Sequence, residues 1–273
     1  MCNISQIKPK LQKLLKENLS LSQHEANCEI ETIFDFCLSW NKTERELKQN
    51  QNLPQNILEQ IENIVSERLK RIPLQYILGQ AYFYGLKLKV NSKVLIPRPE
   101  TELMVEMALQ KLKNINKPKI LEIGTGSGCI SIALASQLQT QNPQIIATDI
   151  SPDCLQIAQE NAQAHKVQSF INFELADLVN EKHLQTNFDL LISNPPYIAE
   201  DEFESLSAEV KCEPYIALIT NKGLECFERI AKLNLKTRHI LFELDPKRAE
   251  QIQEIFGGTI YLDLNCFKRF LMV

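Results

Sequence analysis

The most informative segment of the chain lies at residues 121–135 and reads LEIGTGSGCISIALA. A strand-like apolar run leads into glycines at 124, 126 and 128, and a helix-forming run of small and apolar residues follows. A glycine turn between a strand and a helix lets the backbone approach a ligand closely at the helix N-terminus, where unpaired N–H groups face outward. The chain has only eight glycines, so three at alternate positions indicate a ligand-binding turn.

The spacing of these glycines narrows the kind of ligand. Dinucleotide sites use G-x-G-x-x-G, whereas here the third glycine comes one residue early and Glu122 precedes the turn. A P-loop is excluded because no Gly-Lys-Ser/Thr follows. Asp149 ends the next strand-like run, where a carboxylate can accept hydrogen bonds from both ribose hydroxyls. The pattern predicts a binding site for a nucleoside, and it resembles the cofactor motif of Rossmann-like methyltransferases that use S-adenosylmethionine. A dinucleotide site and a purely structural turn are the alternatives.

Strands and helices alternate through the rest of the chain after Pro118. Strand-like runs occur at Lys119–Ile123, Gln144–Thr148, Phe170–Leu175, Asp189–Ser193 and His239–Glu243. Two helix starts carry a capping residue followed by proline, Ser151-Pro152 and Asp245-Pro246. The pattern predicts an α/β fold with a parallel, doubly wound sheet whose ligand lies at the carboxyl edges of the strands. Residues 259–262 and 269–273 predict a closing hairpin.

Residues 1–72 have a different pattern, with apolar side chains at helical spacing. Ten basic residues balance ten acidic ones there, and residues 50–54 read as a turn between helices. Residues 73–98 become aromatic and alternating around 82–90, which predicts a hairpin that links two domains. The expected organisation is a small helical domain at 1–72, a hairpin linker at 73–98 and an α/β domain at 99–273.

A second motif, Asn194-Pro195-Pro196-Tyr197, follows the fourth predicted strand, 189–193. In the doubly wound strand order the first and fourth strands are neighbours, so this loop should face the glycine loop across one crevice. The prolines stiffen the turn and leave carbonyl groups free as acceptors. The Asn194 side-chain oxygen and the Pro195 carbonyl can each accept one hydrogen of a planar NH2 group, while Tyr197 stacks on its plane. The alternative is a stiff turn without a ligand.

Composition excludes several other classes of protein. Charged residues make up 23% and the net charge is -4, so no global positive field exists to attract nucleic acid. The first twenty residues lack a continuous apolar core and no stretch is apolar enough to cross a membrane, so a cytoplasmic location without a membrane partner is expected. The eight cysteines and four histidines show no metal-binding spacing, so no metal site is expected, and the cysteines should be reduced and mostly buried.

With both motifs in place, the chain resembles the release factor glutamine methyltransferases, the HemK or PrmC family. The resemblance covers nearly the whole chain. It is carried by the helical N-terminal region and, in the family's order, by RIPLQYILG at 71–79, FYG at 83–85, VLIPRPETE at 94–102, Glu213-Pro214 and Ala217-Leu218. The stretch IPRPETE, 96–102, is the most specific. Its residues alone indicate a rigid turn in which Thr101 or Glu100 caps a helix near Leu103 and Arg98 is a candidate for a local ion pair.

The family transfers a methyl group from S-adenosylmethionine to the side-chain amide nitrogen of the glutamine in the Gly-Gly-Gln motif of class-I peptide chain release factors. The product of the cofactor is S-adenosylhomocysteine. The resemblance implies a catalytic domain at 99–273 and a substrate-recognition domain at 1–72. It implies that the cofactor is bound by Gly124, Thr125, Gly126, Ser127, Gly128, Asp149, Asp177, Leu178 and Asn194. The substrate glutamine would be bound by Asn194, Pro195, Pro196 and Tyr197, with Asn194, Pro195 and Tyr197 catalytic.

The chain departs from the family's pattern in three places. The family often has an aromatic residue where Leu178 stands, and Glu-x-Gly-x-x-Gln where this chain has residues 243–248; residues 221–224 are an eroded glycine-rich segment. The alternative function is methylation of the exocyclic amine of adenine in DNA or RNA, because that group is also a planar NH2. A basic groove or a target-reading domain would favour it, and the sequence shows neither. A binding module without activity would be expected to lack Asp149 or Asn194.

Overall fold

The computed structural model describes residues 2–38 and 40–273, which form two compact units. The first, called the helical unit, comprises Met1–Gly79 and the short segment Ala208–Cys212; the second, called the α/β unit, comprises Gln80–Ser207 and Glu213–Val273. No helix in the described ranges is long and apolar enough to cross a membrane. The boundaries predicted at residues 72 and 98, and the roles attached to them, remain predictions.

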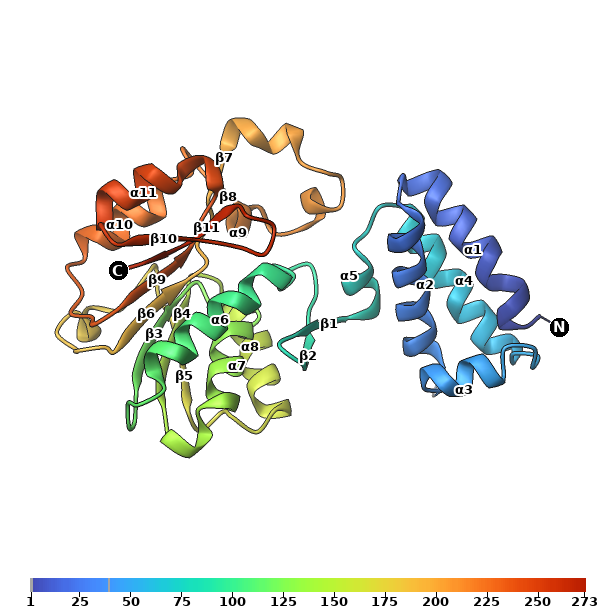
Figure 1. Cartoon of the computed structure of the whole chain (residues 1–273), viewed down its shortest axis with the longest axis horizontal. Coiled ribbons are helices and arrows are strands. Elements are labelled where there is room, and N and C mark those ends of the chain that lie inside the picture. Colours follow the sequence, from blue (N-terminus) through green and yellow to red (C-terminus); the bar gives the residue numbers. More distant parts are fainter. Residues whose placement is uncertain (1, 39) are drawn as a thin grey trace. The chain divides into compact units, whose positions relative to one another are not determined.

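The helical unit contains three longer helices and two short ones: α1 (Ile4–Leu19), α2 (Gln23–Cys37), α3 (Lys42–Leu47), α4 (Gln55–Leu69) and α5 (Leu74–Leu78). The first three helices begin with capping boxes, in which an Asn or Ser side chain and a Gln or Glu three residues later satisfy each other's backbone N–H groups. Helices α1, α2 and α4 lie side by side (Figure 1). Their apolar faces pack into one core around Leu15, Ile30 and Ile61.

A buried arginine joins the segment Ala208–Cys212 to this helical core. Arg68, which is 4% exposed, donates to both carboxylate oxygens of Glu29 and to Glu209 Oε1 at 3.2 Å. Arg71 also donates to Glu209 Oε1, at 3.3 Å. Because a buried charge is costly unless it is paired, these contacts tie the segment to the helical unit.

The α/β unit is built on a seven-stranded sheet with the order β10-β11-β9-β6-β3-β4-β5. Its strands are β3 (Lys119–Ile123), β4 (Gln144–Asp149), β5 (Ile171–Leu175), β6 (Leu190–Ser193), β9 (Ile240–Glu243), β10 (Thr259–Leu262) and β11 (Lys268–Met272). The first five are parallel, and the β10–β11 hairpin adds two antiparallel strands at one edge. The strands begin and end within one residue of the predicted limits, and the predicted fold class is confirmed.

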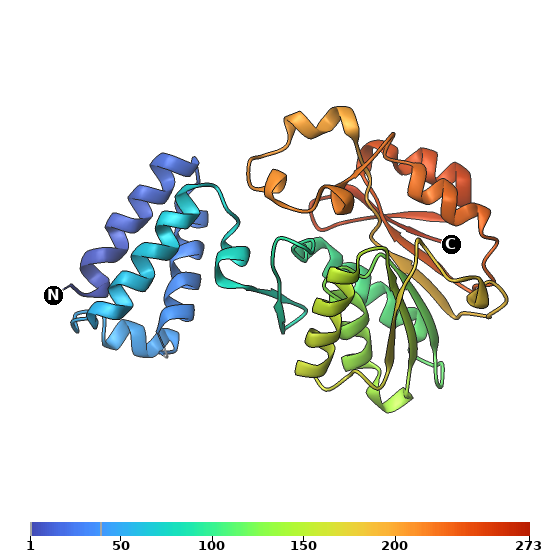
Figure 2. The same cartoon turned by 180° about the vertical axis from the view of Figure 1, so that it is seen from behind.

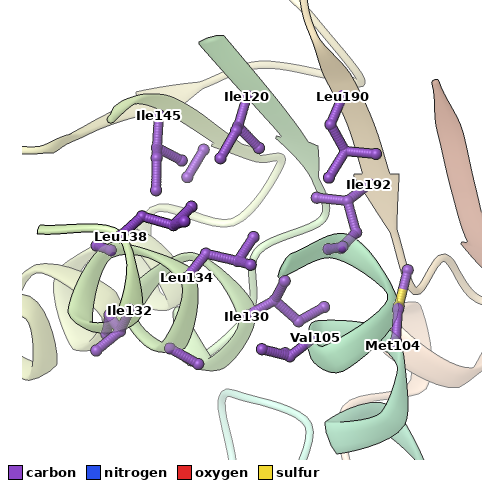
Figure 3. Packing of buried hydrophobic residues seen from close by; sticks show 14 of the residues in the cluster. Met104, Val105, Ile120, Ile130, Ile132, Leu134, Leu138, Ile145, Leu190 and Ile192 are labelled. Atoms are coloured by element: carbon purple, nitrogen blue, oxygen red, sulfur yellow. The ribbon is translucent and has the colours of Figure 1, made fainter. Parts of the chain in front are cut away.

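Helices cover both faces of this sheet. They are α6 (Pro99–Leu112), α7 (Cys129–Gln137), α8 (Pro152–Ala164), α10 (Glu225–Lys232) and α11 (Ala249–Phe256); the short helix α9 (Tyr215–Leu218) directly precedes residues 219–220. Helices α6, α7 and α8 lie on one face and α10 and α11 on the other (Figure 1, and from behind in Figure 2). Figure 3 shows Ile130 and Leu134 of α7 facing the sheet residues Ile120 and Ile192, with Val105 of α6 beside Ile130. Burial of these apolar side chains stabilises the packing of the helices on the sheet.

The α/β unit also contains the hairpin β1 (Gln80–Phe83) and β2 (Leu86–Lys89) and the strand pair β7 (Ile198–Ala199) and β8 (Ile219–Thr220). Its 3-10 turns are η1 (Gln139–Gln141), η2 (Glu181–His183), η3 (Glu200–Ser205) and η5 (Pro246–Arg248). The remaining 3-10 turn of the described residues, η4 (Val210–Cys212), lies in the segment that belongs to the helical unit. The capping residue Ser151 opens α8 as predicted, whereas Asp245 opens η5 before α11 begins. One expectation is wrong: of the eight cysteines only Cys37 and Cys154 are buried, because most of the others lie near the ends of elements or in turns.

Candidate active site

A pocket of about 270 Å³ opens where the parallel strands end, close to the lower end of the range of ~300–1,000 Å³ typical of small-molecule sites. Strands β3 and β6 are direct neighbours, so the loops that follow them share this crevice. Eight of the residues expected from sequence line the pocket: Gly124, Gly126, Asp149, Asp177, Leu178, Asn194, Pro195 and Pro196. The structure therefore brings the glycine loop and the Asn194 loop together at one pocket.

Three residues of the glycine loop do not line the pocket and instead shape the turn. Thr125 and Ser127 are buried, and the Thr125 hydroxyl donates to Glu122 Oε2 at 2.8 Å. Gly128 has φ +81° at the start of α7, where an added Cβ would lie 3.0 Å from the Cβ of Ala158 on α8. The third glycine thus permits close packing of two helices, and a side chain there would be strained as well as crowded.

Glu122 stabilises the glycine turn through hydrogen bonds of its buried carboxylate. Its Oε2 accepts hydrogen bonds from the Thr125 hydroxyl, from the Ser131 N–H at 3.2 Å and from the Ser131 hydroxyl. The carboxyl is 1% exposed, and burial raises its pKa to about 7 although these donors act in the opposite direction. Glu122 therefore links the end of β3 to the first turn of α7.

Asp149, at the end of β4, has a structural role that the sequence did not indicate. Its Oδ2 accepts a hydrogen bond from the Gly126 N–H at 2.8 Å, and its Oδ1 accepts one from the Ser151 N–H at 2.9 Å. Burial raises the pKa of this carboxyl, while the backbone donors oppose the shift. Asp149 therefore orders the glycine loop and the start of α8 while it faces the pocket.

Leu178 lies in a strained turn after β5. It has φ +73°, a conformation that a bulky residue rarely adopts, and the Thr148 hydroxyl donates to its carbonyl oxygen. Beside it, the Asp177 carboxylate pairs with Arg229 of α10 at 2.7 Å, and Arg229 also lines the pocket. No motif pointed to Arg229, because α10 reaches the pocket only through the tertiary fold.

The Asn194 loop is anchored to β3 by Ser193, whose hydroxyl donates to the Ile123 carbonyl at 2.6 Å. The Asn194 amide donates from Nδ2 to Thr101 Oγ1 at 3.5 Å. Tyr197 does not line the pocket; its ring packs in the apolar cluster on the α10–α11 face, and its hydroxyl donates to Glu243 Oε1 at 3.4 Å. Burial raises the pKa of Tyr197. Stacking of Tyr197 on a substrate amide remains a prediction.

The stretch 96–102 differs from its expected local structure. Helix α6 begins at Pro99 with Arg98 as its N-cap, so Glu100 and Thr101 lie in its first turn and do not cap it. Proline at the first helical position has a suitable φ and needs no N–H partner, which explains the earlier start. Arg98 pairs with the distant Glu213 at 2.5 Å, so the local ion pair expected for it is wrong. Glu213 also accepts from the Ile96 N–H at 3.2 Å.

The two segments that carry the unusual residues 221–224 and 243–248 meet at Arg248. Its Nε donates to the Lys222 carbonyl at 3.2 Å, and its guanidinium donates to Glu202 Oε2 at 2.6 Å. Gly223 has φ +73°, and an added Cβ would lie 2.6 Å from the Tyr197 carbonyl oxygen. These segments therefore support the chain directly after Asn194–Tyr197.

The residues around the pocket fit S-adenosylmethionine. Asp149 presents a carboxylate suited to ribose hydroxyls, Ile150 and Leu178 offer apolar walls for an adenine ring, and the glycine backbone lies beside them. No group of His, Cys, Asp or Glu in the described ranges is arranged to hold a metal ion.

Comparison with known proteins shows the family of the chain. Residues 11–79 match the model of the PrmC N-terminal domain, and residues 100–210 match that of the methyltransferase small domain. The release factor glutamine methyltransferase of Chlorobaculum tepidum is 41% identical over 206 residues, covering 71% of this chain and 69% of that protein. The enzyme of the same description from Aquifex aeolicus is 33% identical and covers 95% of this chain and 91% of that protein.

Solved structures show the same fold at low identity. The catalytic domain of hMettl16 in complex with hairpin 1 of the MAT2A 3'UTR has a TM-score of 0.56 and 16% identity, covering 77% of this chain and 80% of that chain. This likeness concerns the fold alone. The family model and the relatives confirm the resemblance seen in the motifs, and the chain belongs to the release factor glutamine methyltransferase family, a family of S-adenosylmethionine-dependent methyltransferases.

Proposed function

We propose that this protein transfers a methyl group from S-adenosylmethionine to the side-chain amide nitrogen of the glutamine in the Gly-Gly-Gln motif of class-I peptide chain release factors. The main support is the pocket shared by the glycine loop and the Asn194 loop, because residues suited to a nucleoside and residues that can accept the hydrogens of an NH2 group line the same pocket. The names of the relatives support the choice of a release factor as substrate.

The bound cofactor supplies an electrophilic methyl group on a sulfonium. The chain must compensate for a weak nucleophile, since the lone pair of an amide nitrogen is delocalised, as the ~18–20 kcal/mol barrier to amide rotation shows. The Asn194 side-chain oxygen and the Pro195 carbonyl accept the two hydrogens of the substrate NH2 and aim its nitrogen. These hydrogen bonds strengthen as the nitrogen becomes cationic. The N–C bond forms as the C–S bond breaks, and one proton leaves to water.

The other parts of the chain have supporting roles in this proposal. Gly124 to Gly128, Asp149, Asp177 and Leu178 hold the cofactor. Residues 1–72 recognise the release factor, which is supported by their neutral charge balance and by their assignment to a separate compact unit. The protein acts in the cytoplasm, with release factors as partners and without nucleic acid or a membrane.

Methylation of adenine in DNA or RNA is the competing function, because its exocyclic amine is also a planar NH2. The net charge of -4 and the motif-matched helical unit disfavour it, since a nucleic-acid enzyme needs a basic surface or a target-reading domain.

The test is transfer of label from methyl-labelled S-adenosylmethionine to separate substrates. These are an intact release factor, the same factor with the motif glutamine replaced by alanine, duplex and single-stranded DNA, and RNA. We expect label only on the intact factor, on the glutamine, as located by mass spectrometry of the digest. Label on adenine, or equal labelling of the factor that lacks the glutamine, would contradict the proposal.

A further inference from the structure

A short hydrogen-bonded chain of side chains runs from the Asn194 loop into the protein interior. Thr101, in the first turn of α6, donates from Oγ1 to Glu243 Oε2 at 2.7 Å. The same Oγ1 accepts a hydrogen bond from Asn194 Nδ2 at 3.5 Å. Thr101 is 2% exposed and Glu243 is 1% exposed, so water does not compete with the contact between them, while Asn194 is half-buried at the pocket. Three distant parts of the sequence thus meet behind one residue of the pocket.

The direction of these hydrogen bonds follows from the number of protons available. A hydroxyl has one proton, and an ionised carboxylate can only accept, so the Thr101 proton must point to Glu243. The Thr101 oxygen then offers only lone pairs to Asn194, and the Asn194 amide must face it with the NH2 group. The Asn194 Oδ1 atom is therefore left for the pocket, and no described residue donates to it.

We propose that Thr101 and Glu243 are positioning residues that set the orientation of the Asn194 amide. The inference rests on the proposed function, because it concerns how Asn194 receives the substrate NH2 group. In this orientation Oδ1 is available to accept a substrate hydrogen. In the reversed orientation the Asn194 NH2 would face the substrate NH2, and two donors would meet without an acceptor.

The charge on Glu243 controls this arrangement. The groups around it are Tyr197, which donates to Oε1 at 3.4 Å, Arg269 on β11, Glu100 on α6, and Thr101 itself. Burial raises the pKa of Glu243, partly opposed by the Thr101 hydrogen bond. A protonated Glu243 can donate to Thr101, which frees the Thr101 proton for Asn194 and favours the reversed amide. Orientation is therefore retained while Glu243 is ionised and is lost as the pH falls through its raised pKa.

The test uses the full chain with saturating labelled S-adenosylmethionine and varied release factor, and it compares three variants. Thr101→Val keeps the shape and removes the hydroxyl, and Thr101→Ser restores the hydroxyl. Glu243→Gln cannot ionise and, like the protonated acid, can donate to Thr101. Thr140→Val, at an exposed position of η1 before β4 begins, is the control for loss of a hydroxyl. Thermal unfolding and cofactor titration accompany each kinetic measurement.

We expect Thr101→Val to lower kcat about 10-fold, less than the ~10²–10³-fold typical of a group that contacts the reacting atoms directly. Its affinity for the cofactor should match that of the wild type, and Thr101→Ser should recover most of kcat. Glu243→Gln, which can donate to Thr101 as the protonated acid does, should lower kcat near neutral pH toward the value that the wild type reaches at low pH, and it should lose the acid limb that Glu243 contributes to the pH dependence of kcat.

The two proposals fail in different ways. Absence of release factor methylation by the wild type would overturn the proposed function, and with it the inference. Methylation by the wild type combined with an unchanged kcat in Thr101→Val would overturn the inference alone. The same follows if Thr101→Ser is as impaired as Thr101→Val, or if the acid limb persists unchanged in Glu243→Gln. If Thr101→Val does not fold, the pH profile of Glu243→Gln decides the matter.

Discussion

Replacement of Asp149 by alanine tests the cofactor site and the structural role of that residue together. The carboxylate accepts from the Gly126 N–H at 2.8 Å and from the Ser151 N–H at 2.9 Å, while it faces the pocket. Each hydrogen bond to a charged group contributes about 1.5–3 kcal/mol when it is buried. The two N–H groups border an open pocket, so water can replace part of the loss, and we expect the variant to remain folded with a lower Tm.

The affinity for the cofactor should also fall, because the ribose loses its acceptor while the glycine loop loses the side chain that orders it. Loss of about 1.5–3 kcal/mol of binding free energy corresponds to a Kd about 10- to 150-fold weaker. Isothermal titration with S-adenosylmethionine measures this, and thermal unfolding without ligand measures the structural part. Asp153→Ala, in the first turn of α8 and exposed, is the matched control and should bind normally.

An unchanged Kd in a folded Asp149→Ala variant would remove Asp149 from the ribose site. Titration with NAD provides a second control, because the glycine spacing disfavours a dinucleotide. Tight binding of NAD by the wild type would contradict the interpretation of the glycine loop.

Three further predictions follow from the same geometry. Asn194→Ala removes an acceptor that strengthens in the transition state, so turnover of release factor methylation should fall about 10²–10³-fold with a much smaller change in cofactor affinity; near-normal turnover would reduce the Asn194 loop to a stiff turn. A variant that lacks residues 1–72 should bind the cofactor but lose most methylation of an intact release factor, and full activity would refute the recognition role. Lys247 and Arg248 lower the pKa of Glu202 to about 2, below its ordinary value, so its ionised form stabilises the fold above about pH 4.5, and this contribution is lost as the pH falls toward 2. Urea unfolding at a series of pH values measures the free energy of unfolding, which should fall less steeply with decreasing pH in Glu202→Gln than in the wild type.

The positions of the strands could be predicted because their signals are local. Alternating apolar runs, the glycine turn and the proline at position 152 depend on near neighbours in the chain, and the structure agrees with them within one residue. The apolar spacing of the N-terminal region also predicted its helical character, but it did not predict the short helix α3 or the inclusion of Ala208–Cys212 in the helical unit. A five-residue segment has no periodicity of its own, and it joins the helices through long-range contacts such as those of Glu209 with Arg68 and Arg71.

Long-range pairs between polar side chains left no signal in the sequence. Arg98 meets Glu213 and Thr101 meets Glu243 across more than a hundred positions, and neither pair belongs to a repeating pattern. Local chemistry favoured a cap for Thr101 and a nearby partner for Arg98, and both expectations were wrong because α6 begins at Pro99 and turns these side chains toward other elements.

The sequence by itself determined the α/β order of elements, the position of the glycine turn between β3 and α7, and the family, since these depend on spacing and residue type. The tertiary structure alone decided which of the motif residues face the pocket, that Asp149 also orders the glycine loop, and that Thr101 and Glu243 lie behind Asn194. The physical reason is that hydrogen bonding and burial act between atoms that the packed helices and strands bring together, and their separation along the chain carries no information about that distance.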